Sequence, residues 1–199
     1  ALVARALEEG MDPKVILNEG LLDGIMIIGA KFRLNEVFVP EVLFAGKAMN
    51  EGLSVLECGP AGAGNEPIGR VVVGTVQGDF HDIGKNLVTM MMKGAGLEVY
   101  DVGVDADAEA FIDKAEEVGA DIIAMSALLT TTMPNMQTVI NELKAKGLRD
   151  RYIVMIGGAP VTQDFADQIG ADYYTADAAS AAEIARQAVL NKKSASTQL

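Results

Sequence analysis

The chain has 199 residues, half of them hydrophobic, and a formal net charge of −12. It is long enough for one ordinary domain and a small helical module, and its acidity disfavours nucleic acid or an anionic membrane as a partner. Cys58 is the single cysteine, which excludes an internal disulfide and a thiolate metal cluster; with no visible secretory signal or membrane span, this favours a cytoplasmic location.

The first 57 residues show helical periodicity and no strand alternation. Asp12-Pro13 is typical of a helix start, with Asp as the N-cap and Pro in the first turn. A second helix is expected over roughly residues 18–32, and a third from Pro40 to about Leu56, after a break at 33–39. With residues 1–9 as the end of another helix, the pattern predicts a four-helix-type bundle over residues 1–57.

Residues 58–69 are rich in glycine and proline, which is typical of a linker. Strand and helix patterns then alternate as far as a polar tail at 192–199. Strands are expected at 71–76, 98–102, 122–126, 153–156 and 172–175, and helices at 84–94, 108–118, 134–146, 162–169 and 180–190. Because the Val- and Ile-rich runs suit strands buried on both faces, residues 70–191 are predicted to form a flavodoxin/Rossmann-like α/β domain with a doubly wound, five-stranded parallel sheet.

Ligands of such a sheet bind outside the carboxyl ends of its strands, and the single histidine, His81, falls in the first loop at that edge. Asp79 and Asp82 flank it, and a carboxylate bonded to one imidazole nitrogen raises the basicity of the other. A zinc or iron site requires several His or Cys ligands, whereas a metal already held by a macrocycle needs only one axial ligand. A structural histidine satisfied by local hydrogen bonds is the alternative interpretation.

These residues also carry a resemblance to a known family. Asp79-x-His81-x-x-Gly84 resembles the D-x-H-x-x-G motif of cobalamin-dependent methionine synthase and of the corrinoid proteins of methyltransferase systems. Ser126-Ala-Leu128 resembles the S-x-L motif of that family, and Gly157-Gly158 resembles its G-G motif. The N-terminal segment around Phe32 and Phe38-Val39-Pro40-Glu41-Val42 is similar to the helical cap of the same proteins, so the resemblance covers nearly the whole chain.

The resemblance implies a role for each matching position. His81 would be the lower axial ligand of the cobalt in cobalamin or a related corrinoid, Asp79 would bond its other ring nitrogen, and Ser126 would bond Asp79. Gly84, Gly157 and Gly158 would admit the nucleotide tail of the cofactor. The other implied contacts are Leu128 and Thr130 in the tail pocket, Tyr174, Thr175 and Ala176 near its buried end, Phe32, Val39 and Val42 shielding the upper face, and Phe80, Asp82, Ile83 and Ala159 completing the cofactor-binding set.

The resemblance also implies a function. The cofactor would alternate between cob(I)alamin and methylcobalamin, taking a methyl group from a substrate-specific methyltransferase. A second methyltransferase would deliver that group to tetrahydrofolate or a thiol, and a reductive activator would be a further partner. The chain is not expected to be catalytic alone, and no residue indicates whether the donor is a methoxyaromatic, methanol, a methylamine or a betaine.

Three other interpretations remain open from the sequence. A cobalamin-binding sensor or regulator would need a DNA-binding or effector domain. The small subunit of an adenosylcobalamin mutase shares the three motifs but is not expected to carry the helical cap. A flavodoxin-like nucleotide binder would hold a flavin in place of a corrinoid.

Overall fold

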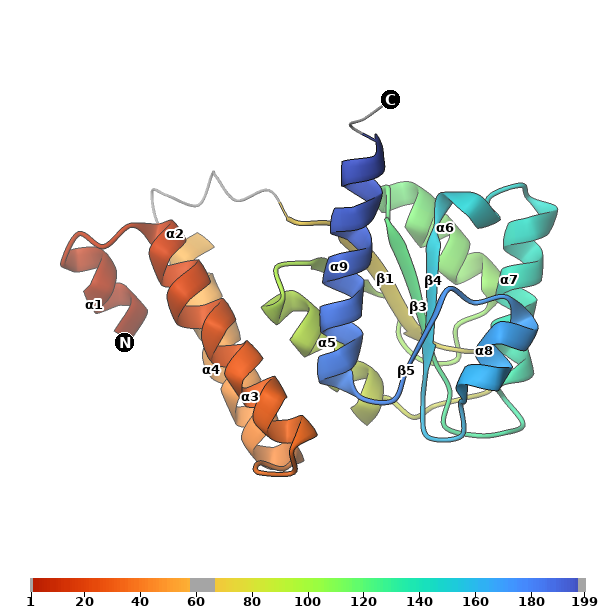
Figure 1. Cartoon of the computed structure of the whole chain (residues 1–199), viewed down its shortest axis with the longest axis horizontal. Coiled ribbons are helices and arrows are strands. Elements are labelled where there is room, and N and C mark those ends of the chain that lie inside the picture. The colour runs from red at the N-terminus through yellow and green to blue at the C-terminus, as the bar shows by residue number, and fades with distance from the viewer. Residues whose placement is uncertain (1, 58–66, 197–199) are drawn as a thin grey trace.

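The structure is a computed structural model that describes residues 2–57 and 67–196. Most of the predicted linker, residues 58–66, and the end of the predicted tail, residues 197–199, lie outside the described residues. The rest forms a helical N-terminal cap beside an α/β domain (Figure 1).

The cap is helical, as predicted, but the helix that begins at Pro13 and the helix expected over residues 18–32 are not separate. Asp12 accepts a hydrogen bond from the Lys14 amide and so caps the helix at Pro13. From there the chain stays helical as far as Arg33, with a π-helical section in the middle and right-handed helical backbone at both junctions. The elements are α1 (Leu2–Glu8), α2 (Pro13–Val15), the π-helix η1 (Ile16–Leu22), α3 (Asp23–Arg33) and α4 (Val39–Glu57).

The sheet has five parallel strands in the order β2-β1-β3-β4-β5, which confirms the predicted doubly wound architecture. The strands are β1 (Arg70–Thr75), β2 (Glu98–Asp101), β3 (Ile122–Ser126), β4 (Ile153–Gly157) and β5 (Tyr173–Thr175). Thr75 lies beside Ser126, which lies beside Gly157, so the carboxyl ends of the three central strands are level. Since β2 and β3 flank β1 on opposite sides, the winding reverses at β1, where such folds bind ligands.

Helices cover both faces of the sheet because successive strand residues point to opposite sides. Val72 packs in the cluster that includes Phe111 of α6, whereas Val71 and Val73 pack in the cluster that includes Met91 of α5. Figure 1 shows α5 and α9 on one face and α6, α7 and α8 on the other. The helices are α5 (Ile83–Gly94), α6 (Ala108–Val118), α7 (Pro134–Ala145), the short 3-10 helix η2 (Arg149–Arg151), α8 (Gln163–Ile169) and α9 (Ala178–Ser196).

The last helix is longer than predicted and takes in the start of the segment expected to be a polar tail. Two lysines in that segment are tied to the body of the domain. Lys192 Nζ donates to the Arg151 carbonyl at 2.6 Å, and Lys193 Nζ donates to the Ile68 carbonyl at 2.7 Å. These bonds are a physical reason for the helix to continue to Ser196.

The cap packs on the layer formed by α5 and α9. Ile25, Val42 and Met49 of the cap share a buried cluster with side chains of β1, α5 and α9. At the surface, Arg33 Nη1 lies 3.0 Å from Glu183 Oε2 of α9. The α3–α4 turn lies at the end of the molecule where the strands end (Figure 1). Among the described residues, no helix is both long enough and apolar enough to cross a membrane.

Candidate corrinoid site

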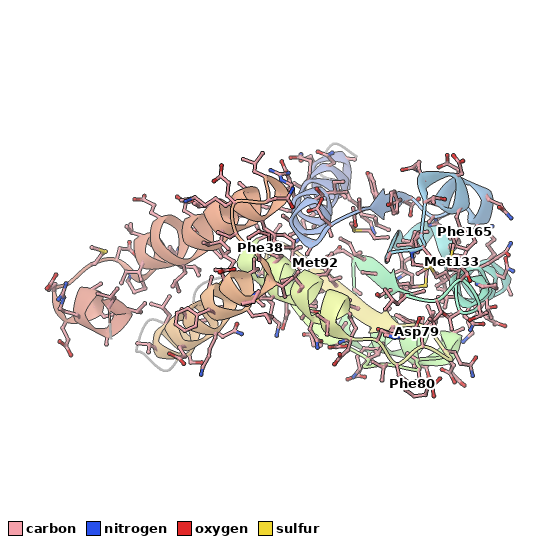
Figure 2. The ribbon with its side chains drawn as sticks, turned by 90° about the horizontal axis from the view of Figure 1, so that it is seen from below. Phe38, Asp79, Phe80, Met92, Met133 and Phe165 are labelled. Carbon is pink, nitrogen blue, oxygen red and sulfur yellow. The ribbon has the colours of Figure 1, made fainter. Side chains whose placement is uncertain are left out.

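The loop from β1 to α5 is held in place at several points. The Asp79 amide donates to the Val76 carbonyl at 3.1 Å, and the buried Thr75 hydroxyl donates to the His81 carbonyl at 2.9 Å. Asn135 of α7 donates to the Gln77 carbonyl at 2.6 Å. Figure 2, which views the molecule from the carboxyl edge of the sheet, labels Asp79 and Phe80 of this loop. The predicted motif therefore lies at the edge where the sheet reverses its winding.

Asp79 is fully buried and accepts hydrogen bonds on both carboxylate oxygens. Oδ1 lies 2.7 Å from His81 Nδ1 and accepts from the His81 amide at 3.1 Å. Oδ2 accepts from the Leu128 amide at 2.8 Å, the Leu129 amide at 3.2 Å and the Thr132 hydroxyl at 2.8 Å. Burial alone would raise the pKa of this carboxyl, but the hydrogen bonds from His81, Leu128 and Thr132 outweigh it and hold the pKa well below its usual range.

The His81 ring is fixed on one side and open on the other. An ionised carboxylate only accepts hydrogen bonds, so Nδ1 carries the proton and the lone pair is on Nε2. The side chain is 51% exposed. Phe80 and Ile83 beside it are 68% and 70% exposed, so two large apolar side chains face solvent next to the ring. The imidazole thus presents a bare nitrogen next to an apolar surface.

The surroundings of His81 fit a metal held in an apolar macrocycle. A Cβ at Gly84 would meet no atom within 4 Å, so there is open space beside the first turn of α5. Leu128 and Leu129 across from it are 43% and 41% exposed. Within residues 2–57 and 67–196, no group of three His, Cys, Asp or Glu side chains is placed to hold a metal ion. One nitrogen ligand, an apolar rim and free space are what a corrinoid would require of the protein.

Ser126 does not bond Asp79, so this prediction is wrong. The donors from the β3–α7 loop are two backbone amides and Thr132, because the carboxylate lies beyond the strand ends and faces the turn of that loop. Ser126 is the last residue of β3, and its carbonyl accepts from the Val76 amide. The sequence pattern missed Thr132 because three threonines in a row, residues 130–132, do not indicate which one turns inward.

Gly157 and Gly158 lie at the end of β4, as predicted, but the fold itself requires the second of them. Gly158 has φ +131°, and a Cβ there would come within 1.9 Å of the Ala127 carbonyl oxygen. The Ala127 amide also donates to the Gly157 carbonyl at 3.2 Å. The close approach at this point is between β4 and the β3–α7 loop, whether or not a cofactor tail passes nearby.

The remaining predicted tail residues are spread along the edge of the sheet and are not gathered around His81. Thr175 ends β5, the strand farthest from β2, and is nearly buried, while Tyr174 is partly buried against the core. Thr130, Ala159 and Ala176 are exposed in the loops at this edge. A ligand touching all of them would have to extend from β1 across β3 and β4.

The cap residues predicted to shield the upper face of the cofactor differ in how far they are buried. Val42 is fully buried in the core, so the prediction that it shields an open face is wrong for this arrangement of the cap. Phe32 is partly buried against the same cluster, and Val39 is half-buried. The most exposed large apolar side chains near the α3–α4 turn are Leu34 (68%), Phe38 (64%) and Phe44 (77%).

A second polar network holds the start of α5. Asn86 Nδ2 donates to Asp82 Oδ2 at 3.1 Å, and Lys85 Nζ donates to Asn86 Oδ1 at 2.8 Å. The Lys85 side chain is 3% exposed and forms an ion pair with Asp101 at the end of β2. The helix that follows His81 is therefore anchored to the strand next to β1.

Comparisons with known proteins show relatives that match nearly the whole chain. Two family models, both described as B12 binding domain, match residues 1–57 and 69–185. Dimethylamine corrinoid protein 2 of Methanosarcina acetivorans is 45% identical over 186 residues, covering 93% of this chain and 86% of the relative. A corrinoid protein of Desulfitobacterium hafniense is 45% identical over 189 residues, covering 94% and 88%.

A solved structure resembles this chain in its fold as well as in its sequence. The methanol:cobalamin methyltransferase complex MtaBC of Methanosarcina barkeri contains a chain that superposes with a TM-score of 0.84 at 31% identity, covering 94% of this chain and 71% of that chain. The chain therefore belongs to the B12-binding corrinoid proteins of methyltransferase systems, and its cofactor is cobalamin or a related corrinoid. The predicted family, cap-and-sheet architecture and cofactor are confirmed, and the relatives do not favour the sensor interpretation.

Proposed function

We propose that the chain carries a methyl group on the corrinoid cobalt between two methyltransferases, with His81 as the lower axial ligand. The observation that supports this most is the pairing of buried Asp79 with half-exposed His81, at 2.7 Å, at the edge where the sheet binds ligands. In the proposed division, residues 1–57 are the cap and 70–191 the corrinoid-binding domain, and the two family matches support it. A cytoplasmic location belongs to the proposal and rests on the single cysteine.

The bound corrinoid supplies a cobalt centre that accepts and releases a methyl group. The chain supplies the ligand and controls its basicity. Asp79 keeps the proton at Nδ1 of His81, which leaves the Nε2 lone pair for the metal and strengthens it as a donor. Because Leu128, Leu129 and Thr132 hold Asp79 in place, the carboxylate cannot follow the imidazole, and the ring cannot turn away without breaking its hydrogen bond to Asp79.

The partners in this proposal are a substrate-specific methyltransferase, a second methyltransferase that delivers the methyl group to tetrahydrofolate or a thiol, and a reductive activator. A methyltransferase partner is supported by the corrinoid chain that occurs in the methanol methyltransferase complex. Dimethylamine is the first donor to test, because several relatives at 44–47% identity are named dimethylamine corrinoid proteins.

The function is tested by methyl transfer. The corrinoid-loaded protein is mixed with a methyltransferase for dimethylamine, methanol, a methoxyaromatic or a betaine, each with an isotopically labelled substrate. We expect the label to reach the protein-bound cofactor with one class of enzyme, and to leave it when the second methyltransferase and its acceptor are added. If none of the four classes methylates the bound cofactor, the proposal is wrong.

Gly84→Leu is expected to block corrinoid binding without weakening the fold. Its Cβ meets nothing within 4 Å in the protein alone, so the unfolding free energy should stay within about 0.5 kcal/mol. If the cofactor tail uses this space, affinity should fall more than about tenfold, measured by titration with cobalamin. Gly24→Leu, whose Cβ in α3 is equally free of neighbours, is the matched control and should change neither quantity. Unchanged affinity in Gly84→Leu would remove Gly84 from the site.

A further inference from the structure

The loop between β2 and α6 contains a strained residue, Asp105. Its φ is +53°, and among the described residues only Asn35 is another non-glycine residue with positive φ. A left-handed conformation costs an L-residue about 1 kcal/mol or more, and strain of this kind persists where the surrounding structure enforces it. Asp105 is exposed, so packing in the core does not enforce it.

Two hydrogen bonds enforce it, and both go to the turn that carries the site. Asp105 Oδ1 accepts from the Gly78 amide at 2.7 Å, and the Asp105 amide donates to the Asp79 carbonyl at 2.9 Å. Gly78 itself has φ +80°, so its peptide is turned to meet the carboxylate. The two bonds hold the backbone of Gly78 and Asp79 from the side of Asp105. The Asp79 side chain, which orients His81, projects from this segment.

The loop around Asp105 is firmly joined to β1. The Thr75 amide donates to the Gly103 carbonyl at 2.9 Å, and the Ala106 amide donates to the Thr75 carbonyl at 3.0 Å. Val76 and Ala106 form a parallel bridge, and Ala106 is buried. Asp105 therefore projects from a fixed segment and can hold the turn in place.

We propose that Asp105 is a positioning residue for the Asp79–His81 pair, so that the pair is held from two sides. The β3–α7 loop holds the Asp79 side chain through Leu128, Leu129 and Thr132. The β2–α6 loop holds the Asp79 backbone through Asp105. With both loops in place, the Asp79 carboxylate is held in one orientation. The carboxylate in turn holds the His81 ring in one tautomer and one orientation. The relevance to cobalt rests on the proposed function, but the positioning is a property of the protein without cofactor.

Two substitutions at Asp105 and one control in the same loop test whether its side-chain oxygen holds the turn. Asp105→Gly removes the acceptor and also relieves the positive φ, so the turn should loosen with little loss of overall stability. Asp105→Asn keeps an acceptor oxygen and tolerates the left-handed conformation, so it should behave as the wild type. Asp107→Ala is the control in the same loop: it removes the N-cap bond to the Ala110 amide, at 2.9 Å, and touches neither Gly78 nor Asp79.

The readout is the His81 imidazole in the cofactor-free protein. Since His81 is the only histidine, ¹⁵N-histidine labelling gives one ring to observe by NMR. We expect the exchange of the Nδ1 proton with water to rise about fivefold in Asp105→Gly, the equivalent of one net hydrogen bond. Asp105→Asn and Asp107→Ala should stay within about twofold of the wild type.

If Asp105→Gly leaves the exchange rate and the tautomer unchanged, or if Asp107→Ala raises the rate equally, the proposal is wrong. This outcome does not depend on cobalt. Conversely, a wild-type protein whose His81 does not ligate cobalt would overturn the proposed function and leave the positioning result intact.

Discussion

Gly158→Ala is expected to destabilise the protein by about 4 kcal/mol, combining backbone strain with overpacking. The added Cβ would lie 1.9 Å from the Ala127 carbonyl oxygen and 2.9 Å from its carbon, which are backbone atoms that cannot rotate away. The φ of +131° also disfavours any L-residue. The displaced segment continues into Leu128, whose amide donates to Asp79, so the damage should reach the site. Chemical denaturation of the cofactor-free protein measures the loss.

Gly147→Ala is the control for conformation without collision. Gly147 has φ +69°, but a Cβ there would meet nothing within 4 Å. It should cost about 1 kcal/mol, the penalty of a left-handed backbone alone. Similar losses of unfolding free energy in the two variants would show that the close contact between Gly158 and Ala127 does not contribute to the effect.

Asp79→Asn is expected to cost about 3 kcal/mol at neutral pH and to invert the His81 tautomer. The carboxylate oxygens face donors on both sides, from His81 and from the Leu128–Leu129 turn. An amide has only one oxygen, so its NH₂ group must face donors on one side. If the oxygen stays with the two loop amides, the NH₂ faces His81 Nδ1, which must then accept. The proton moves to Nε2, and the nitrogen proposed to bind cobalt loses its free lone pair.

The stability of the wild type should fall in the acid range as Asp79 is protonated, and the Asp79→Asn variant should lack this contribution. Because the pKa of Asp79 is lowered in the folded state, its stabilising contribution is full above the unfolded value of about 3.9 and is lost as the pH falls below it. Denaturation across the acid range and ¹⁵N NMR of the ring measure the two effects. Thr132→Val, which removes one donor to Oδ2, is the control; it should cost about 1 kcal/mol and leave the tautomer unchanged. A wild-type tautomer in Asp79→Asn would contradict this prediction.

The position of the site could be predicted from the sequence, whereas its hydrogen-bond partners could not. His81 follows a buried apolar run, and the rule that parallel sheets bind ligands at their carboxyl edge places it without coordinates. The choice of Thr132 over Ser126 depends on the path of the β3–α7 turn, which no periodicity encodes. The role of Asp105 depends on a contact across 27 positions in the sequence.

In the cap, too, the ends of helices could be predicted from the sequence, whereas the contacts between helices could not. The start at Pro13 and the break before Val39 follow from local residue preferences, and both are present. The face of α4 that is buried depends on where α5 and α9 pack, which the apolar pattern does not indicate, so the predicted exposure of Val42 is wrong. The continuous helix from Pro13 to Arg33 had no counterpart in the apolar pattern, because the π-helical section shifts the periodicity within it.

Electron paramagnetic resonance tests the central claim most directly. The protein is loaded with cobalamin in its cobalt(II) state, once with natural histidine and once with ¹⁵N-histidine, which labels His81 alone. If Nε2 of His81 is the axial ligand, the nitrogen splitting of the cobalt lines should change from a triplet to a doublet on labelling. Identical splitting in the two preparations would show that another nitrogen, or none, occupies the lower position, and would contradict the account.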